Sequence, residues 1–148
     1  MLNQELKDIF NRDLNHLKKE IASYQNEKNL WIINDNISNS AGNLCLHLVG
    51  NLKWFVGAQL GNSGYVRNRE FEFSAKNVPR SELLKEIDET ISIVTASLDS
   101  MSSAALDDVY PIEVFKKPMS SRFFLIHLST HLSYHLGQIN YHRRIFDR

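Results

Sequence analysis

The chain contains a single cysteine, Cys45, among its 148 residues. No internal disulfide can form, and zinc fingers and redox motifs built from cysteine pairs are excluded. Long apolar runs are also missing, because no stretch approaches the roughly eighteen consecutive apolar residues that a membrane span needs. The segment from Met1 to Arg12 mixes acids and bases and lacks the apolar centre of a signal peptide. We therefore expect a cytoplasmic protein with no membrane partner.

Charge of one sign does not dominate either. Lysine plus arginine and aspartate plus glutamate number 17 each, so the formal net charge is zero. Such a chain has no general field that would draw it to nucleic acid, and we expect no nucleic-acid partner. The hydrophobic share of 43% and the charged share of 23% are ordinary for a globular protein. At this length we predict one domain over residues 1–148, large enough to bury a substantial core.

Apolar residues recur at spacings of three and four in most of the chain, as they do in amphipathic helices. The predicted helices run from about Leu2 to Ser23, from near Ser40 to Gly61 or Gly64, from near Pro79 to Met101 and from near Ser120 to about Phe146. We interpret two short alternating segments, 71–73 and 109–115, as connections, since Pro111 interrupts the second. The linkers 25–39, 62–78 and 102–119 are long, and long loops are often functional. The pattern predicts an all-α four-helix bundle with long inter-helix loops.

The last predicted helix carries His127, His131 and His135 at intervals of four residues. This spacing returns to nearly the same side of a helix, and Gln138 and His142 fall in the same sector of about 80°. Imidazole is a common ligand of zinc and its neighbours, and a shared cation removes the cost of burying several imidazoles together. The pattern favours a metal site. The alternative is a polar helix face that lines a wet groove.

A third ligand must come from another helix, and the best candidate is His47. It lies in a polar row with Asn43 and Asn51, again at spacings of four, on a helix that is otherwise apolar. From spacing alone, His47 either binds a metal or satisfies a buried hydrogen-bond network. Other sites fit poorly: one Asp-x-x-His match, from Asp13 to His16, does not make a di-iron site, and no metalloprotease, Walker or nucleophile-elbow motif is present.

These residues resemble a known family. The segments Gly-Asn-Leu-Cys-Leu-His47-Leu-Val-Gly-Asn and His131-Leu-Ser-Tyr-His135-Leu-Gly-Gln138 are similar to the DinB-like superfamily, the damage-inducible group of four-helix metal-binding proteins. The segment from Arg67 to Phe71 is similar to a bacterial subfamily of unknown function within it. The resemblance covers nearly the whole chain. It implies an up-down-down-up bundle, a homodimer, and a metal held by His47, His131 and His135.

The resemblance also suggests roles for the neighbouring residues. Polar side chains expected to support the ligands or line a substrate site are Asn43, Asn51, His127 and Gln138. Loop residues expected to contact the site are Arg67, Arg69 and Glu70. Many members have an arginine where this chain has Leu136, which alters the polar support around the site. Three imidazoles suit zinc or nickel best, and also iron or manganese.

The function implied by the resemblance is catalytic. Three neutral imidazoles leave a coordination position open, as at catalytic metal centres. Characterised relatives include thiol-dependent transferases and isomerases. The leading hypothesis is therefore a metal-dependent enzyme that transfers a low-molecular-weight thiol of the bacillithiol type to a small electrophile. The alternatives are a metal-dependent hydrolase and a non-catalytic metal-binding or interaction protein. No residue stands out as a general base, so the catalytic residues are unassigned.

Overall fold

Helices account for all the regular structure of the protein. The computed structural model describes residues 1–148 and contains no β-strand. The long helices are α1 (Leu2–Ala22), α2 (Ala41–Leu52), α5 (Arg80–Ser100) and α6 (Ser121–Phe146). Shorter elements are 3-10 helices at Glu27–Trp31 and Ala104–Asp107, a π-helical segment at Lys53–Ala58, and the short helices α3 (Gln59–Gly61) and α4 (Arg69–Ser74). The all-α class expected from the sequence is confirmed.

The long helices begin where the sequence predicts. The Ser40 side chain accepts a hydrogen bond from the Asn43 backbone N–H at 3.1 Å, and Ser120 accepts one from the Phe123 N–H at 3.1 Å. Each bond satisfies a donor that the first turn of a helix leaves without a partner. Pro79 occupies the N-cap position of α5. The predicted helical segments are thus confirmed to within a few residues at each end.

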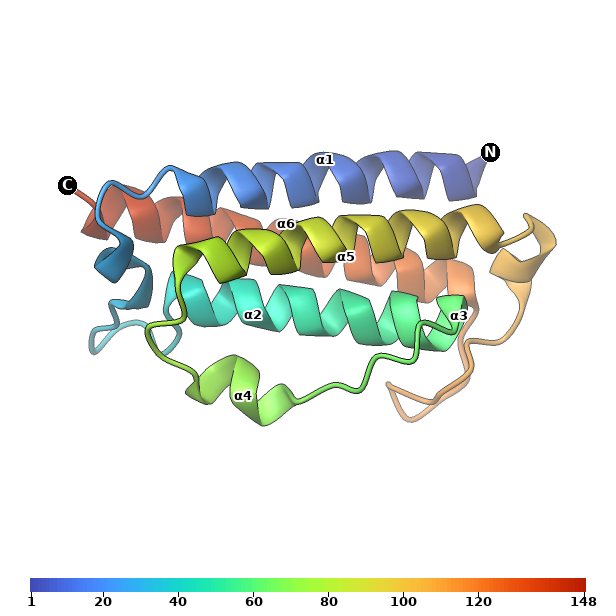
Figure 1. Cartoon of the computed structure of the whole chain (residues 1–148). Helices are drawn as coiled ribbons and strands as arrows, with labels where there is room; N and C mark the ends of the chain where they lie inside the picture. Colours follow the sequence, from blue (N-terminus) through green and yellow to red (C-terminus); the bar gives the residue numbers. More distant parts are fainter.

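The long helices lie side by side in two antiparallel sets. In Figure 1, α1 and α6 run in one direction, and α2 and α5 run in the other. Helix α1 packs on α5 and α6, and α2 packs on the same two helices. This arrangement brings α2, which carries His47, against α6, which carries the other histidines.

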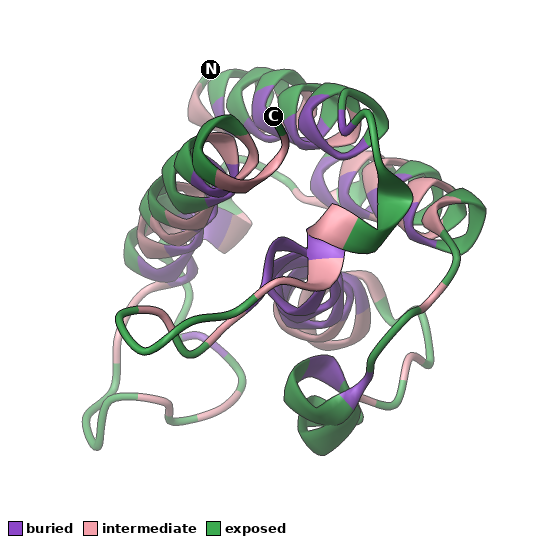
Figure 2. Cartoon of the chain, turned by 90° about the vertical axis from the view of Figure 1, so that its left-hand side faces the viewer, coloured by how far each residue is buried: buried purple, intermediate pink, exposed green.

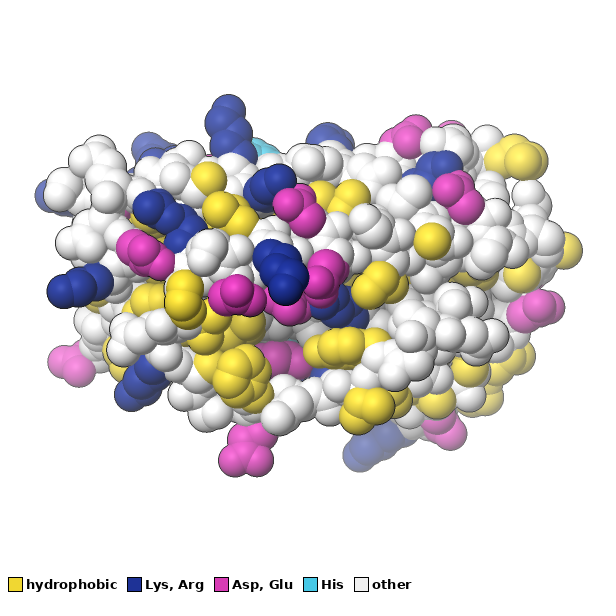
Figure 3. Space-filling view, in the orientation of Figure 1, with side chains coloured by type: hydrophobic (Ala, Val, Ile, Leu, Met, Phe, Trp, Pro, Cys, Tyr) yellow, Lys and Arg dark blue, Asp and Glu magenta, His cyan; other side chains and the backbone are white.

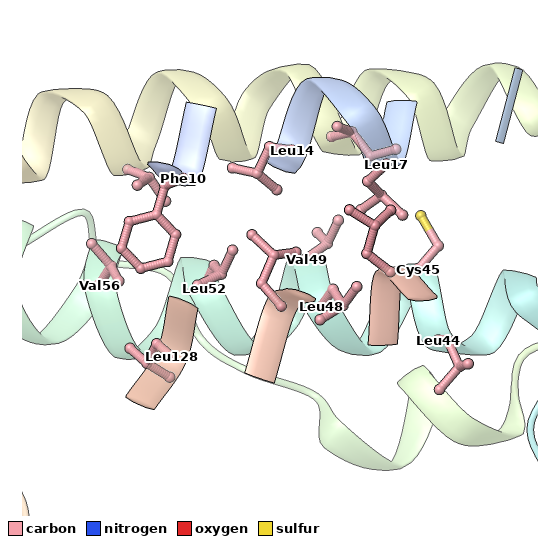
Figure 4. Packing of buried hydrophobic residues seen from close by; sticks show 14 of the residues in the cluster. Phe10, Leu14, Leu17, Leu44, Cys45, Leu48, Val49, Leu52, Val56 and Leu128 are labelled. Carbon is pink, nitrogen blue, oxygen red and sulfur yellow. The ribbon is translucent and has the colours of Figure 1, made fainter. Parts of the chain in front are cut away.

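Helix α2 is the most deeply buried element. All twelve of its residues are buried, and Figure 2 shows it as an almost wholly buried ribbon. Its apolar side chains belong to the same core as those of α1, and Figure 4 shows Phe10 and Leu14 on the side of Leu52 and Val49, with Leu17 toward the Cys45 end of α2. These residues belong to one core of 28 buried hydrophobic residues. Because buried polar groups need partners, the polar row on α2 must find them on neighbouring elements.

Helix α4 corrects our interpretation of the linker after α2. Residues 71–73 form part of this helix rather than an irregular connection. The Asn68 side chain caps it by accepting a hydrogen bond from the Phe71 N–H at 3.1 Å. The alternating pattern also misleads about burial, since Phe71 is 48% exposed whereas Glu72 is only 3% exposed. A six-residue helix is too short for helical periodicity to appear in the sequence.

Two features fix the linker and the end of the second helical segment. The Asn43 Nδ2 donates to the carbonyls of Glu72 at 3.0 Å and Ala75 at 2.8 Å, which fastens α4 to α2. Beyond α2, the helical path continues through the π-helical segment to α3. There Lys53 pairs with Glu86 at 2.6 Å and Glu89 at 3.0 Å. Both linkages join segments that are distant in sequence.

The surface shows no concentration of one charge on the face viewed in Figure 3. Acidic and basic side chains alternate there, and hydrophobic side chains lie between them. The pair of Lys18 and Asp88, at 2.8 Å, is one example from α1 and α5. None of the helices has the length and apolarity required to cross a bilayer.

Candidate metal centre

Three histidines from two helices converge at one point. His47 extends from α2, and His131 and His135 extend from α6. One ring nitrogen of each lies within 4.8 Å of the corresponding atoms of the other two. The Nε2 atoms of His47 and His131 are 3.2 Å apart. The structure therefore brings together the three residues that could hold a metal ion.

The hydrogen bonds of the rings fit this use. The Nδ1 of His47 lies 3.1 Å from Oε1 of Glu72, and the Nδ1 of His135 lies 2.7 Å from Oε1 of Gln138. Both oxygen atoms accept, so each Nδ1 donates its proton and each Nε2 keeps a lone pair. Two nitrogen ligands on a tetrahedral zinc are about 3.4 Å apart. The 3.2 Å separation between His47 and His131 is close to that spacing.

Glu72 is the residue that fixes His47. Its side chain is 4% exposed, and its two oxygens receive hydrogen bonds from Arg67 at 2.8 Å and 2.9 Å. Burial raises the pKa of Glu72, but the hydrogen bonds from His47 and Arg67 together outweigh burial and lower it. The carboxylate is therefore ionised beside the imidazole. A carboxylate that accepts from the second nitrogen of a histidine sets the tautomer and the orientation of the ring.

Gly50 provides the space for this carboxylate. It follows His47 by three residues, on the same side of α2. A Cβ atom at position 50 would overlap Oε2 of Glu72. The close approach of α4 to α2 therefore requires the absence of a side chain at this position.

The two histidines of α6 are held in the neutral form. Burial, together with the positive charges that His135 and His47 would carry, lowers the pKa of His131 to about 4. Burial also lowers the pKa of His135, and the hydrogen bond to Gln138 offsets only part of that effect. Neutral imidazole is the form that binds metals. Near neutral pH, both rings can therefore bind a cation without first losing a proton.

The other polar residues expected near the site have separate positions. Gln138 contacts His135 and also donates to the Tyr134 hydroxyl at 3.3 Å. Asn43 contacts no histidine, because its amide is bonded to the backbone around α4. Asn51 is buried, and its Oδ1 has no hydrogen-bond partner. Of these residues, Gln138 is the one that supports a ring of the triad directly.

His127 lies outside the triad. Its ring centroid is 6.4 Å from that of His131, and it packs at 4.9 Å from Phe115 and 5.8 Å from Phe124. The regular spacing of the histidines along α6 therefore does not give them equal roles. His127 lines the space next to the triad.

The three charged residues expected from the loop also differ. Arg67 binds Glu72, and Arg69 places its guanidinium 5.1 Å from the Phe73 ring centroid. Glu70 is exposed, and its side chain makes no hydrogen bond in the chain. The sequence analysis did not identify Glu72, although it follows Glu70 by only two residues. The one sequence feature that relates to Glu72 is Gly50, and its meaning becomes clear only when the packing of α4 against α2 is known.

The remaining histidines, His16 and His142, lie away from the triad. His142 is buried, donates from Nε2 to the Ile32 carbonyl at 2.8 Å, and accepts at Nδ1 from the Tyr24 hydroxyl at 2.7 Å. Burial lowers its pKa. His16 is exposed and lies 3.7 Å from Glu20. Neither residue approaches the triad.

Comparison with known proteins gives a family but no described activity. A search of curated proteins found no match. The family described as "Protein of unknown function (DUF1572)" matches residues 2–148, almost the full length of the chain. The chain therefore belongs to the DUF1572 family of proteins of unknown function.

Proposed function

We propose that this protein is a metal-dependent enzyme that transfers a low-molecular-weight thiol, of the bacillithiol type, to a small electrophile. The observation that carries the proposal is the convergence of His47, His131 and His135, with their ring nitrogens within 4.8 Å of one another. Hydrogen bonds to Glu72 and Gln138 leave a lone pair on Nε2 of His47 and His135. Such a donor set suits a divalent cation, and the proposed ion is zinc or nickel, with iron or manganese as alternatives.

Residues of the chain would hold the metal ion and leave part of its coordination sphere free. Three histidine ligands leave at least one coordination position open, where the ion would lower the pKa of a bound thiol or water. Glu72 and Gln138 would hold two of the rings in their binding orientation. The aromatic side chains next to His131 would keep water away from the open position.

Thiol transfer fits the surroundings of the triad better than hydrolysis. A hydrolytic reaction usually needs a general base within hydrogen-bond reach of the attacking water. The carboxylate nearest the triad is Glu72, and both of its oxygens are already engaged by His47 and Arg67. A thiol that is ionised on binding needs no further base. Hydrolysis therefore remains the second candidate.

We also propose that the fold is the DinB-like four-helix bundle and that the protein is a homodimer. The two antiparallel sets of helices in Figure 1 support the up-down-down-up order. Large hydrophobic side chains on the outer face of α6 support self-association, since exposed apolar patches commonly mark interfaces. They are Phe123, Ile126, Tyr134, Tyr141 and Ile145. Sedimentation equilibrium would show a single species of twice the 17.1 kDa chain mass if this is correct.

Activity assays on untagged protein test the proposed reaction. We expect metal-loaded protein to accelerate the reaction of bacillithiol with 1-chloro-2,4-dinitrobenzene, and we expect His47→Ala to abolish the acceleration. Turnover of 4-nitrophenyl acetate without any thiol would indicate the hydrolase instead. Bound metal with neither activity, across a panel of thiols and electrophiles, would indicate a non-catalytic metal-binding protein.

A further inference from the structure

A cavity of about 320 Å³ adjoins the triad. His47 and His131 line one part of it, and the rings of Phe55, Phe115 and Phe124 line another. We call it the aromatic cavity. Its volume lies at the small end of the range of about 300–1,000 Å³ for ligand sites. Such a space suits a compact molecule rather than a polymer or a large cofactor.

The charge around the aromatic cavity is positive. Arg67 and Arg69 line it, and no aspartate or glutamate does. Arg67 is neutralised by its pair with Glu72, but Arg69 forms no ion pair in the chain. A guanidinium without an anionic partner is suited to bind a carboxylate through two parallel hydrogen bonds. The cavity therefore favours an anionic ligand.

Two buried polar atoms without partners belong to residues that line the same cavity. They are Oδ1 of Asn51 and Nδ1 of His131. Asn51 is only 6% exposed, and its amide makes no hydrogen bond in the chain. If Nε2 of His131 binds an ion, Nδ1 carries the proton and must donate it. A group that accepts from His131 and donates to Asn51 would satisfy both atoms, and a hydroxyl has this capacity.

The walls favour a flat ring. Phe124 lies edge-on to Phe55 at a centroid distance of 5.0 Å and to Phe115 at 5.9 Å. Aromatic rings prefer such edge-to-face and offset contacts, and a bound ring can extend the same arrangement. A purely polar ligand would leave these apolar faces in contact with water.

We infer that the aromatic cavity binds a single-ring aromatic carboxylate that bears a hydroxyl group. The inference concerns a bound ligand next to the triad and goes beyond the proposed thiol transfer, because this ring carries no group that a thiol could displace. The side chains that recognise the ligand line the cavity. The carboxylate meets Arg69, the ring lies among the phenylalanines, and the hydroxyl meets Asn51 and His131.

Calorimetric titration of zinc-loaded protein with 4-hydroxybenzoate tests the inference. We expect saturable binding, and we expect Arg69→Gln to weaken it about tenfold or more, since a charge-assisted hydrogen bond is lost. The control variant is Arg144→Gln, because Arg144 is also exposed and lies 5.3 Å from an aromatic ring, that of Tyr141. We expect this variant to bind like the parent protein.

The neutral analogue 4-hydroxybenzyl alcohol distinguishes recognition of the carboxylate charge from nonspecific binding. It should bind the parent protein about tenfold more weakly than 4-hydroxybenzoate, but the Arg69→Gln variant should bind both compounds equally. Absence of 4-hydroxybenzoate binding at millimolar concentration, or equal binding by the parent and Arg69→Gln, would overturn the inference. Metal content measured on the same samples keeps the two proposals distinct. Loss of metal binding with intact titration would refute only the proposed function.

Discussion

Two groups of histidines on α6 show how different partners give the same residue different roles. His131 and His135 face His47 across the helix interface, whereas His142 lies two turns further along and faces Tyr24 and Ile32. Both ring nitrogens of His142 are satisfied by the chain. In the triad, Nδ1 of His131 has no hydrogen-bond partner, and Nε2 of His47 faces only Nε2 of His131. Spacing along one helix therefore identifies a face, but the elements packed against that face decide the chemistry.

The largest expected effect comes from Glu72, which distinguishes the triad from the structural histidine. Glu72→Ala would leave the partly buried Arg67 and the buried His47 without their partner. Removing one member of a buried ion pair costs about 3–5 kcal/mol, so we expect a loss of about 3 kcal/mol in the free energy of unfolding. Urea denaturation would measure it. The isosteric Glu72→Gln should lose less, because its amide oxygen still accepts from His47, and equal losses in the two variants would contradict this role.

His142→Phe tests the structural role of His142, in contrast to the triad. The substitution leaves the Tyr24 hydroxyl and the Ile32 carbonyl without partners, and each unsatisfied buried group costs about 1–3 kcal/mol. We expect the free energy of unfolding to fall by about 2 kcal/mol. Metal stoichiometry, measured by elemental analysis, should stay the same as in the parent protein. A loss of metal in this variant would show that the two groups of histidines are not independent.

A smaller effect is expected where α4 approaches α2. Gly50→Ala places a methyl group in the space of the Glu72 carboxylate, so the hydrogen bond to His47 should weaken. Loss of such support typically costs about 10–100-fold in metal affinity, and we expect the lower value. Gly137→Ala is the matched control, because a Cβ atom there meets nothing within 4 Å. Competition titration with a chelator would compare them, and equal affinities would argue against a role for Glu72.

Acid should destabilise the metal-free protein gradually. Burial lowers the pKa values of His131, His135 and His142 from the ordinary 6.5, so the unfolded chain binds more protons than the folded one below that pH. Stability should therefore fall as the pH drops below 6.5. Lowered carboxylate pKa values, such as that of Glu72, add a further loss only below about 4.5. Unfolding titrations at several pH values would show it, and constant stability between pH 6.5 and 5 would contradict it.

The long helices and the position of the triad were predictable because they depend on regular spacing. Periodicity over twenty or more residues fixed α1, α5 and α6, and Ser40 and Ser120 marked two of the starts. His131 and His135 share one face of a helix, and the family resemblance supplied His47. Local sequence information was sufficient for the helices and for the histidines of α6, whereas the assignment of His47 to the same site needed the resemblance.

Features that depend on contacts between distant segments were not predictable. Asn43 holds α4 by binding the carbonyls of Glu72 and Ala75, which follow it by 29 and 32 residues, and α4 positions Glu72 beside His47. The partner of His142 is Tyr24, which lies 118 residues away. No periodic pattern reports such contacts, so Glu72 was missed while its exposed neighbour Glu70 was named.

Metal stoichiometry of untagged protein tests the central claim most directly. We predict one divalent ion per chain in the parent protein and in His142→Phe, and loss of that ion in both His47→Ala and His131→Ala. Circular dichroism would confirm that the variants remain helical. Retention of the ion by both His47→Ala and His131→Ala would contradict the proposed three-histidine centre.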